Sequence, residues 1–272
     1  MTQDRNFDDL AHRFKRNVYD GLKGAVRLRV LERDFAEFIP ALATSEPASQ
    51  RPLRILDAGG GQGQFALTLA AQGHAVALCD ISTVMLRLAR QQVELQGLDN
   101  VELIHAPIQA LAQHIESRFD LVLCHAVLEW VAEPRRLLRI LQSLVAPGGF
   151  LSLTFYNRHS LIYKNLLRTN FKKVQKRQYR GYRGSLTPTN PLDPAEVYAW
   201  LEVEPMTVLC KSGIRVFHDY IFDKRDRERV VALGVQVDQG PQEVVPDEHE
   251  REDRGDRDQL LCLHHGLQGV HA

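Results

Sequence analysis

Apolar and polar positions change their period several times along the chain. Over residues 7–38 apolar residues recur at helical spacing and basic residues fill the other faces, which predicts helix, with Gly21 and Gly24 as places where it can be interrupted. From residue 53 onward short apolar runs alternate with helical patterns. Strands that are almost wholly apolar, separated by helices, predict a parallel sheet covered on both faces. The predicted strands are 53–56, 75–79, 101–105, 119–124 and 150–155.

The segments between these runs predict the covering helices. Gly73 is expected to close the first of them, and Ser82 or Thr83 to cap the second. The fold class is therefore α/β, a Rossmann-like doubly wound and mostly parallel sheet. The predicted helices are 65–72, 84–96, 108–115, 134–145 and 195–202, and residues 206–217 are expected to form a further strand element.

The stretch from Asn157 to Gly184 has a different character. It contains nine Lys and Arg residues and no acid, with Tyr and Phe interleaved. Such a pattern suits contacts with the phosphates and bases of an RNA stem-loop, and a solvated helical insertion is the alternative. We expect an N-terminal helical cap over 1–50, a core over 51–157, this basic aromatic arm over 158–194, and a C-terminal part over 195–229.

Composition narrows the functional classes only a little. The 34 basic and 34 acidic residues give no net charge, so attraction to nucleic acid must come from a local patch. Four cysteines without a CxxC pair disfavour a disulfide framework or a zinc site, and Cys79 and Cys124 are expected in the core. The charged start and the lack of a long apolar run predict a cytoplasmic protein without a membrane span.

Candidate chemistry begins at a glycine loop, Asp57-Ala58-Gly59-Gly60-Gly61-Gln62-Gly63, between a strand and a helix. Such glycines allow a ligand close to the backbone, and the missing GK[ST] disfavours nucleoside triphosphates. Asp80 follows the second strand, where a carboxylate accepts both hydroxyls of a ribose. Gln109 follows the third strand at the same edge. Taken singly, these features also fit a tight turn, a helix cap and a solvated side chain.

Together these features resemble the class I methyltransferases. Pro147-Gly148-Gly149 before the fifth strand, and His125 to Trp130 after the fourth, fit that class and are not expected in a dehydrogenase. His125 then emerges at the carboxyl end of a strand, facing the crevice.

A closer resemblance, over about residues 3 to 225, is to the bacterial tRNA 5-carboxymethoxyuridine methyltransferases. The stretches that carry it are QDRNFDD, LDAGGG, HAVLEWV, FYN and GIRVFHDY. The resemblance implies S-adenosylmethionine as cofactor and a carboxymethoxyuridine at the wobble position of tRNA as methyl acceptor. It also implies a cofactor site formed by Arg27, Gly59, Gly60, Asp80, Ile108, Gln109 and His125. For Arg27 alone, a solvated helix face is the alternative.

The implied reaction is an in-line transfer of methyl to a carboxylate oxygen. A carboxylate is ionised at neutral pH, so the reaction requires positioning rather than a general base, and no catalytic residue or metal is expected. Trp130, Tyr156 and His218 are candidates to stack on or shape a flipped base, with core or rim packing as their alternative. Arg215 is expected to hold the distal carboxylate oxygen or a phosphate. The expected substrate contacts are Trp130, Tyr156, Asn157, Arg215, His218, Lys172, Lys173 and Arg177, and the expected partner is a tRNA anticodon stem-loop.

The sequence after about Arg229 departs from the family pattern. Class I methyltransferases end their sheet with an antiparallel strand pair, whereas this chain has a charge run over 246–258 that suits no buried strand. We expect the terminal strand to be lost and the tail over 230–272 to be disordered, leaving an exposed sheet edge. A shift of reading frame near Val230 explains this tail, and a natural disordered tail is the alternative.

Two other functions fit part of the pattern. A methyltransferase for a small carboxylic acid or quinone precursor shares the core, but such substrates do not need the basic arm. A non-catalytic cofactor- or RNA-binding protein is the other reading, which the intact glycine loop, Asp80 and His125 disfavour.

Overall fold

The structure is a computed structural model, and it describes most of the chain. The described residues are 4–15, 22–39, 42, 51–115, 117–179, 184–202, 206–214, 220–221, 223, 225–226, 229, 243–244 and 259–266. None of the helices in this part of the chain is both long and apolar enough to cross a bilayer.

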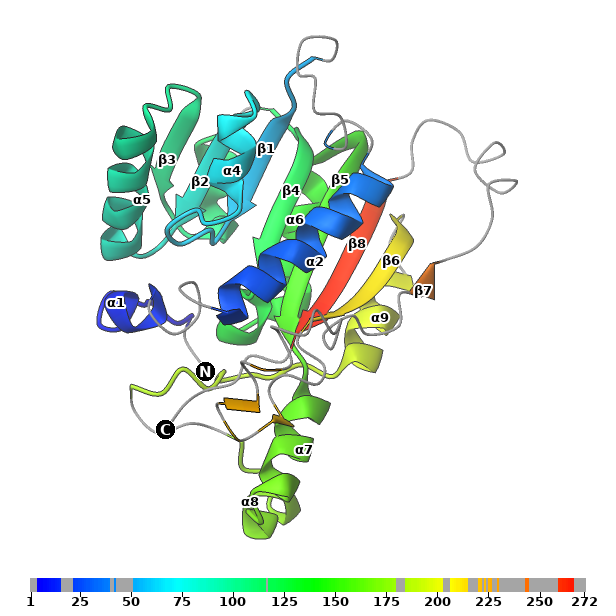
Figure 1. Cartoon of the computed structure of the whole chain (residues 1–272). Helices are drawn as coiled ribbons and strands as arrows, with labels where there is room; N and C mark the ends of the chain where they lie inside the picture. Colours follow the sequence, from blue (N-terminus) through cyan, green and yellow to red (C-terminus); the bar gives the residue numbers. More distant parts are fainter. Residues whose placement is uncertain are drawn as a thin grey trace.

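One eight-stranded sheet organises the molecule (Figure 1), in the order β3-β2-β1-β4-β5-β8-β6-β7. Neighbouring strands run parallel from β3 to β6, and β6 pairs antiparallel with β7. The carboxyl ends of the parallel strands therefore share one edge, and the predicted doubly wound fold is confirmed. The strands are β1 Arg54–Ala58, β2 Ala75–Asp80, β3 Val101–His105, β4 Phe119–His125, β5 Val145–Tyr156, β6 Met206–Ile214, β7 Glu243–Val244 and β8 Gln259–Gly266.

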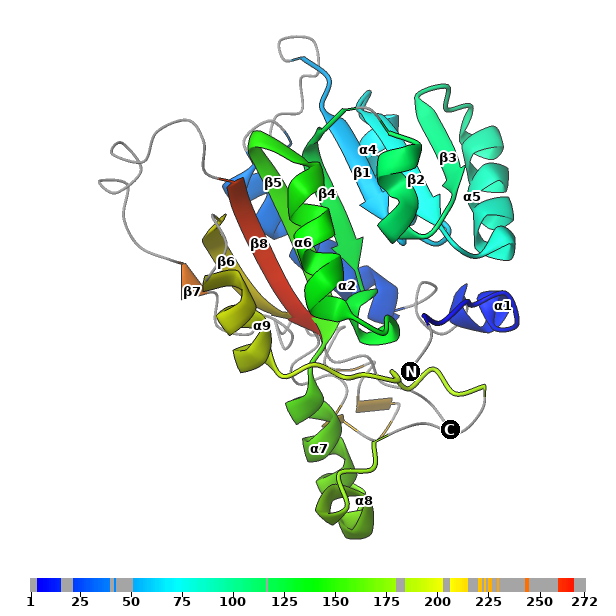
Figure 2. The same ribbon diagram turned by 180° about the vertical axis from the view of Figure 1, so that it is seen from behind.

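Helices cover both faces of the sheet (Figures 1 and 2). In β1, Ile55 packs in the layer of α2, α4 and α5, while its neighbour Leu56 packs in the layer of α6 and α9. Consecutive residues of a strand point to opposite faces, which is why the central strands are apolar throughout. The helices are α1 Ala11–Phe14, α2 Leu22–Phe38, α4 Ala66–Ala71, α5 Thr83–Gln96, α6 Pro134–Leu144, α7 Arg158–Leu167, α8 Phe171–Gln175 and α9 Pro194–Glu202, with short 3-10 turns η3 Ile108–Gln113 and η4 Leu128–Trp130.

Several ends of helices lie where single residues of the sequence predicted them. Ser82 caps α5, because its hydroxyl accepts a hydrogen bond from the amide of Met85 at 3.1 Å. Gly73 follows α4 with a left-handed φ of 92°, as expected for the residue after a helix. Cys79 and Cys124 are buried free cysteines, as predicted.

The predicted N-terminal helix was too long. Residues 4–10 are not helical, α1 is one turn, and α2 begins at Leu22. The reason is tertiary: Asp4 and Asp8 in the non-helical segment accept hydrogen bonds from residues far along the chain, at Ala132 and Ser82. The spacing of apolar residues predicts a helix but cannot predict hydrogen bonds to residues that are distant in the sequence.

The expectation of a lost terminal strand was also wrong. Residues 259–266 form β8, which lies between β5 and β6 and pairs parallel with both, not antiparallel. Their sequence, QLLCLHHG, includes an apolar run that suits a buried strand, and the pairing covers the edges that β5 and β6 would otherwise expose. The charge run over 246–258 lies outside the described residues, and the shift of reading frame stays a prediction.

Candidate active site

The glycine loop between β1 and α4 is held tightly against β2. The amides of Gly59 and Gly60 both donate to the carbonyl of Cys79, at 2.8 and 3.1 Å. Gly59 has a φ of 73°, and a Cβ at Gly60 would lie 2.4 Å from Cγ of Asp57. Only glycine fits this path, so the shape of the loop is set by its backbone.

Asp80 ends β2 and faces the same crevice. Its two carboxylate oxygens accept from the amides of Gly61 at 2.9 Å and of Ser82 at 2.7 Å. Burial raises the pKa of Asp80. Burial, and then the charge of Asp80, raises the pKa of Asp57 to about 7. Each oxygen of Asp80 keeps a lone pair, so the carboxylate is oriented and still able to accept from a ligand hydroxyl.

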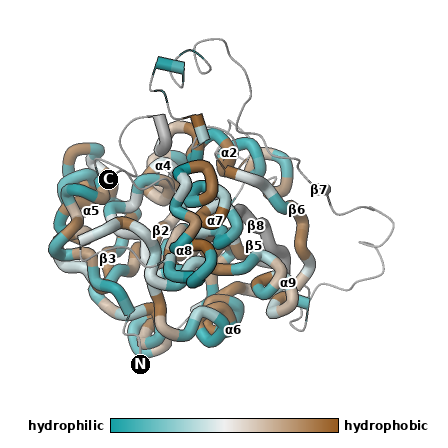
Figure 3. Tube along the Cα trace, turned by 90° about the horizontal axis from the view of Figure 1, so that it is seen from below, coloured by the Kyte–Doolittle hydropathy of each residue, from teal (hydrophilic) through white to brown (hydrophobic). Residues whose placement is uncertain are grey.

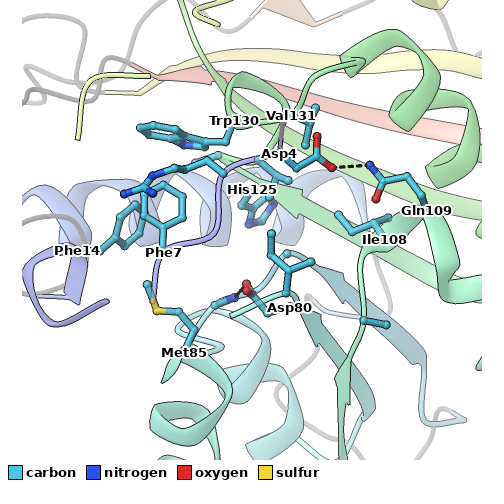
Figure 4. A pocket seen from close by; sticks show the side chains of 17 residues that line it. Asp4, Phe7, Phe14, Asp80, Met85, Ile108, Gln109, His125, Trp130 and Val131 are labelled. Carbon is cyan, nitrogen blue, oxygen red and sulfur yellow. Dashed lines mark hydrogen bonds between the residues drawn. The ribbon is translucent and has the colours of Figure 1, made fainter. Parts of the chain in front are cut away.

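A pocket opens at this carboxyl edge (Figure 4). Six residues of the expected site line it, and four of the other lining residues come from the N-terminal segment and α1. Ile81 and Ala106 add apolar wall beside Ile108, so a carboxylate that can accept from a diol stands next to an apolar surface. This combination fits a nucleoside such as the adenosine of S-adenosylmethionine. The expected residues in the lining are Gly59, Asp80, Ile108, Gln109, His125 and Trp130.

The N-terminal segment closes one side of the pocket. Asp4 accepts from the amide side chain of Gln109 at 2.9 Å and from the backbone amide of Ala132 at 2.8 Å (Figure 4). Asp8 accepts from the hydroxyl of Ser82 at 2.6 Å, and this hydrogen bond lowers the pKa of Asp8. Sequence reasoning missed Asp4 as a pocket residue, since the contact joins residues more than a hundred positions apart.

His125 stands at the end of β4, as predicted. Its Nε2 lies 2.9 Å from the hydroxyl of Ser152, a fully buried residue of the adjacent β5. This contact fixes the rotation of the imidazole ring in the pocket wall. Ser152 was not among the expected residues, because an internal serine in an apolar strand gives no signal of its neighbour.

Three expected substrate contacts, Trp130, Tyr156 and Asn157, pack against or hydrogen-bond to other parts of the protein. Trp130 is 4% exposed and packs at right angles to Phe7, with ring centroids 4.8 Å apart. Its indole N–H finds no hydrogen-bond acceptor among the described residues. Tyr156 is also buried, and the side chain of Asn157 caps α7 by accepting from the amide of His159. Their roles toward a substrate stay predictions.

Beneath the pocket lies a buried acid that sequence reasoning did not single out. Glu129 is fully buried, and neither oxygen of its carboxyl has a hydrogen-bond partner of good geometry within the described part of the chain. Burial raises the pKa of Glu129 to about 8, while the nearby backbone amides of Glu129 and Tyr156, and then the positive charge of Arg27, oppose that rise. Arg27 is itself buried and donates to Gln64 at 3.4 Å. Arg27 is not part of the pocket lining, so its expected contact with the cofactor stays a prediction.

The remaining expected residues lie elsewhere. Lys172 and Lys173 are exposed on α8 and Arg177 directly follows it, all outside this pocket. α7 and α8 project from the carboxyl edge of the sheet, and α8 is predominantly hydrophilic (Figures 1 and 3). Arg215 and His218 lie outside the described residues.

Comparison with known proteins finds one match to the central part of the chain and another to most of it. Residues 56–153 match the methyltransferase domain family. The tRNA 5-carboxymethoxyuridine methyltransferase of Escherichia coli K12 is 45% identical over 226 residues, which are 83% of this chain and 84% of that protein. The ubiquinone biosynthesis O-methyltransferase of Acinetobacter baylyi is 32% identical over 110 residues, covering 40% of this chain and 46% of that protein.

A solved structure agrees with the fold. The plantazolicin methyltransferase BamL, in complex with a substrate analogue and S-adenosylhomocysteine, aligns with a TM-score of 0.53 and 16% identity. The alignment covers 84% of this chain and 83% of that chain. At this identity the likeness concerns the fold alone.

Proposed function

The chain belongs to the family of tRNA 5-carboxymethoxyuridine methyltransferases, and we propose that it esterifies the carboxylate of 5-carboxymethoxyuridine at the tRNA wobble position. It is an S-adenosylmethionine-dependent methyltransferase of the class I fold. The observation that carries the proposal is a pocket that sets Asp80 beside an apolar wall at the carboxyl edge of the sheet, with a basic arm projecting from the same edge.

The cofactor site is assigned to the residues that the pocket and its loop bring together. Gly59 and Gly60 leave the backbone open to close approach, and Asp80 would accept from the ribose hydroxyls. Gln109 and Ile108 would contact the adenine, and the buried Arg27 would attract the carboxylate of the methionine moiety. When bound, S-adenosylmethionine supplies an activated methyl group.

The chain's own contribution is positioning. The acceptor carboxylate is already ionised at neutral pH, so no base has to remove a proton. The walls around His125 and Trp130 exclude water and limit the directions from which an acceptor can approach. Alignment of reacting groups in this way accounts for large rate factors without a catalytic side chain.

The basic residues of the arm favour an anticodon stem-loop as the partner. Lys172, Lys173 and Arg177 are exposed, and residues 157–184 contain no acid that would neutralise them. Phosphate contacts by such groups are strong at low salt and weaken as counterions are added. The small-molecule alternative lacks this support, because the ubiquinone biosynthesis O-methyltransferase matches only 110 residues of this chain and small acids do not need the arm.

The test uses tRNA from cells that lack the gene. Purified protein and S-adenosylmethionine are added, and wobble nucleosides are analysed by mass. We expect a gain of one methyl group on 5-carboxymethoxyuridine. A matched Asp80→Asn protein, which should lose most cofactor affinity, gives the blank. No gain from a protein that binds S-adenosylhomocysteine would contradict the assigned acceptor.

A further inference from the structure

A second pocket lies at the base of the arm, separate from the cofactor pocket. It is bounded by the start of α7, the segment after α8, and residues that lead into α9. The wall includes the side chains of Ile162 and Tyr179, and a cation, Arg177, lies at the rim. None of the expected roles concerns this pocket, although Arg177 was expected to contact RNA.

Hydrogen bonds link the second pocket to the chain segment that lines the cofactor pocket. Thr189, which lines the second pocket, donates through its hydroxyl to the carbonyl of Glu129 at 3.4 Å, and the amide of Asn190 donates to the same carbonyl at 3.0 Å. The next residue, Trp130, lines the cofactor pocket. Residues 129 and 130 therefore connect the second pocket to the wall of the cofactor pocket, beside which the acceptor nucleotide has to lie.

The charges of the second pocket leave one cation available. Arg158 forms an ion pair with Asp193 and lies 3.5 Å from Glu196, so its charge is neutralised within the protein. Although burial opposes it, the amide of Ala195 and Arg158 lower the pKa of Asp193, which keeps this acid ionised. Within the described part of the chain Arg177 pairs with no carboxylate. Arg158 and Arg177 together balance Asp193 and Glu196, so the pocket has no excess charge, but the guanidinium of Arg177 is not held by either acid and can bind a phosphodiester.

The backbone at Arg177 adopts a left-handed conformation that few residues other than glycine take up. Arg177 has a φ of 51° directly after the C-cap Lys176, and the amide of Gln178 donates back to the carbonyl of Lys173 at 3.0 Å. This left-handed position at a helix end is the one that glycine adopts with least strain. The backbone alone therefore favours glycine, whereas the pocket places a cationic side chain there.

We infer that the second pocket is a subsite for a nucleotide next to the one that is methylated. Arg177 binds the phosphate of this nucleotide, and Tyr179 and Ile162 contact its base. Aromatic contact of this kind is tolerant of base identity and adds to the electrostatic contact. The inference rests on the proposed RNA substrate.

The deciding variant is Arg177→Gly, which removes the cation and relieves the backbone. Thr169→Gly is its matched control, because Thr169 has a φ of 58° after α7 but does not line the pocket. Binding of a fluorescent anticodon stem-loop is measured by anisotropy over a salt series, together with the thermal midpoint of each protein.

We expect Arg177→Gly to weaken stem-loop binding about tenfold and to reduce the slope of log affinity against log salt by about 0.7, as for one phosphate contact on a single strand. Its thermal midpoint should not fall. Thr169→Gly should bind the stem-loop like the unaltered protein, and Arg177→Lys should recover part of the affinity.

The base contact is tested with abasic stem-loops. Removing the base on one side of the acceptor should weaken binding to the unaltered protein severalfold, and should have little further effect on Tyr179→Ala. Unchanged affinity and salt slope for Arg177→Gly, with the unaltered protein binding the stem-loop, would overturn the subsite. Binding differences without any methyl transfer would retain the subsite and reject the proposed reaction, so the two failures are distinguishable.

Discussion

The cofactor pocket and the arm recognise their ligands by different physical means. The pocket is shaped by backbone: Gly59 and Gly60 donate to β2, and Asp80 is oriented by two amides. The arm presents exposed charges on short helices, with Lys172 and Lys173 open to solvent. A site shaped by backbone is sensitive to one added methyl group, whereas a surface of charges loses affinity gradually.

The arm also differs from the cofactor pocket in that it exposes large apolar side chains to solvent. Of those exposed in the described part of the chain, Tyr163, Leu166, Leu167 and Phe171 all lie on the arm, and Leu95 is the remaining one. Apolar groups exposed beside basic ones suit a surface that meets both bases and phosphates. The pocket instead encloses its apolar residues.

The largest expected effect is on the backbone-shaped site. In Gly60→Ala the new Cβ would lie 2.4 Å from a buried carboxyl carbon, so the loop must move. Overpacking of this kind costs about 1–3 kcal/mol, and we expect cofactor affinity to fall up to about a hundredfold in titration calorimetry. Stem-loop binding should be unchanged.

Gly73→Ala is the control for Gly60→Ala. Gly73 also has a left-handed φ, but nothing lies within 4 Å of a Cβ built there. It should lose about 1 kcal/mol of stability through backbone strain and keep its cofactor affinity. Equal cofactor affinities for the two variants would show that the loop is not shaped as described.

The next effect concerns the acid beneath the pocket. Burial raises the pKa of Glu129 to about 8 in the folded protein, from an ordinary value of 4.5. The folded state therefore binds this proton more tightly than the unfolded state. The stabilisation is fully present below pH 4.5 and is lost as the pH rises through about 8.

Glu129→Gln removes this titration. We expect its free energy of unfolding to depend less on pH, by about 1 kcal/mol per pH unit between pH 5 and 7, in denaturant titrations. Glu133→Gln serves as control, because the Glu133 side chain is 67% exposed beside Arg136. A pH dependence for Glu129→Gln identical to that of the unaltered protein would contradict the buried neutral carboxyl.

The smallest effect is expected on the arm. Replacing both Lys172 and Lys173 by Gln should weaken stem-loop binding about tenfold near 0.15 M salt and reduce the salt slope by about 1.4, which is two contacts of 0.7 each. Cofactor affinity should not change. The exposed pair Arg87 and Arg90 on α5, replaced by Gln, gives the control for loss of charge alone. If both double variants lost the same stem-loop affinity, Lys172 and Lys173 would contribute only through the overall charge of the protein and not through specific contacts.

Much of the sheet and of the cofactor site could be predicted because their signals are local. A strand, a glycine loop and a helix follow one another in sequence, and Asp80 ends the neighbouring strand. Parallel strands bring such ends to one edge by geometry alone. Six expected residues accordingly line a single pocket.

The errors occurred where distant residues meet. The N-terminal segment is non-helical because Asp4 and Asp8 bind to Ala132 and Ser82. The tail was judged by its charge run, yet residues 259–266 beyond that run pair with β5 and β6.

The sequence by itself determined the alternation of strands and helices over residues 53–156, the glycine loop, the acid after the second strand and the family. These depend on periodicity and on residue types at short spacing. Only the tertiary structure decided that Asp4 closes the pocket, that Ser152 holds His125, that Glu129 is buried, and that a second pocket adjoins the first. Each of these depends on contacts between segments far apart in the chain, and only folding creates such contacts and the low-dielectric surroundings of a buried acid.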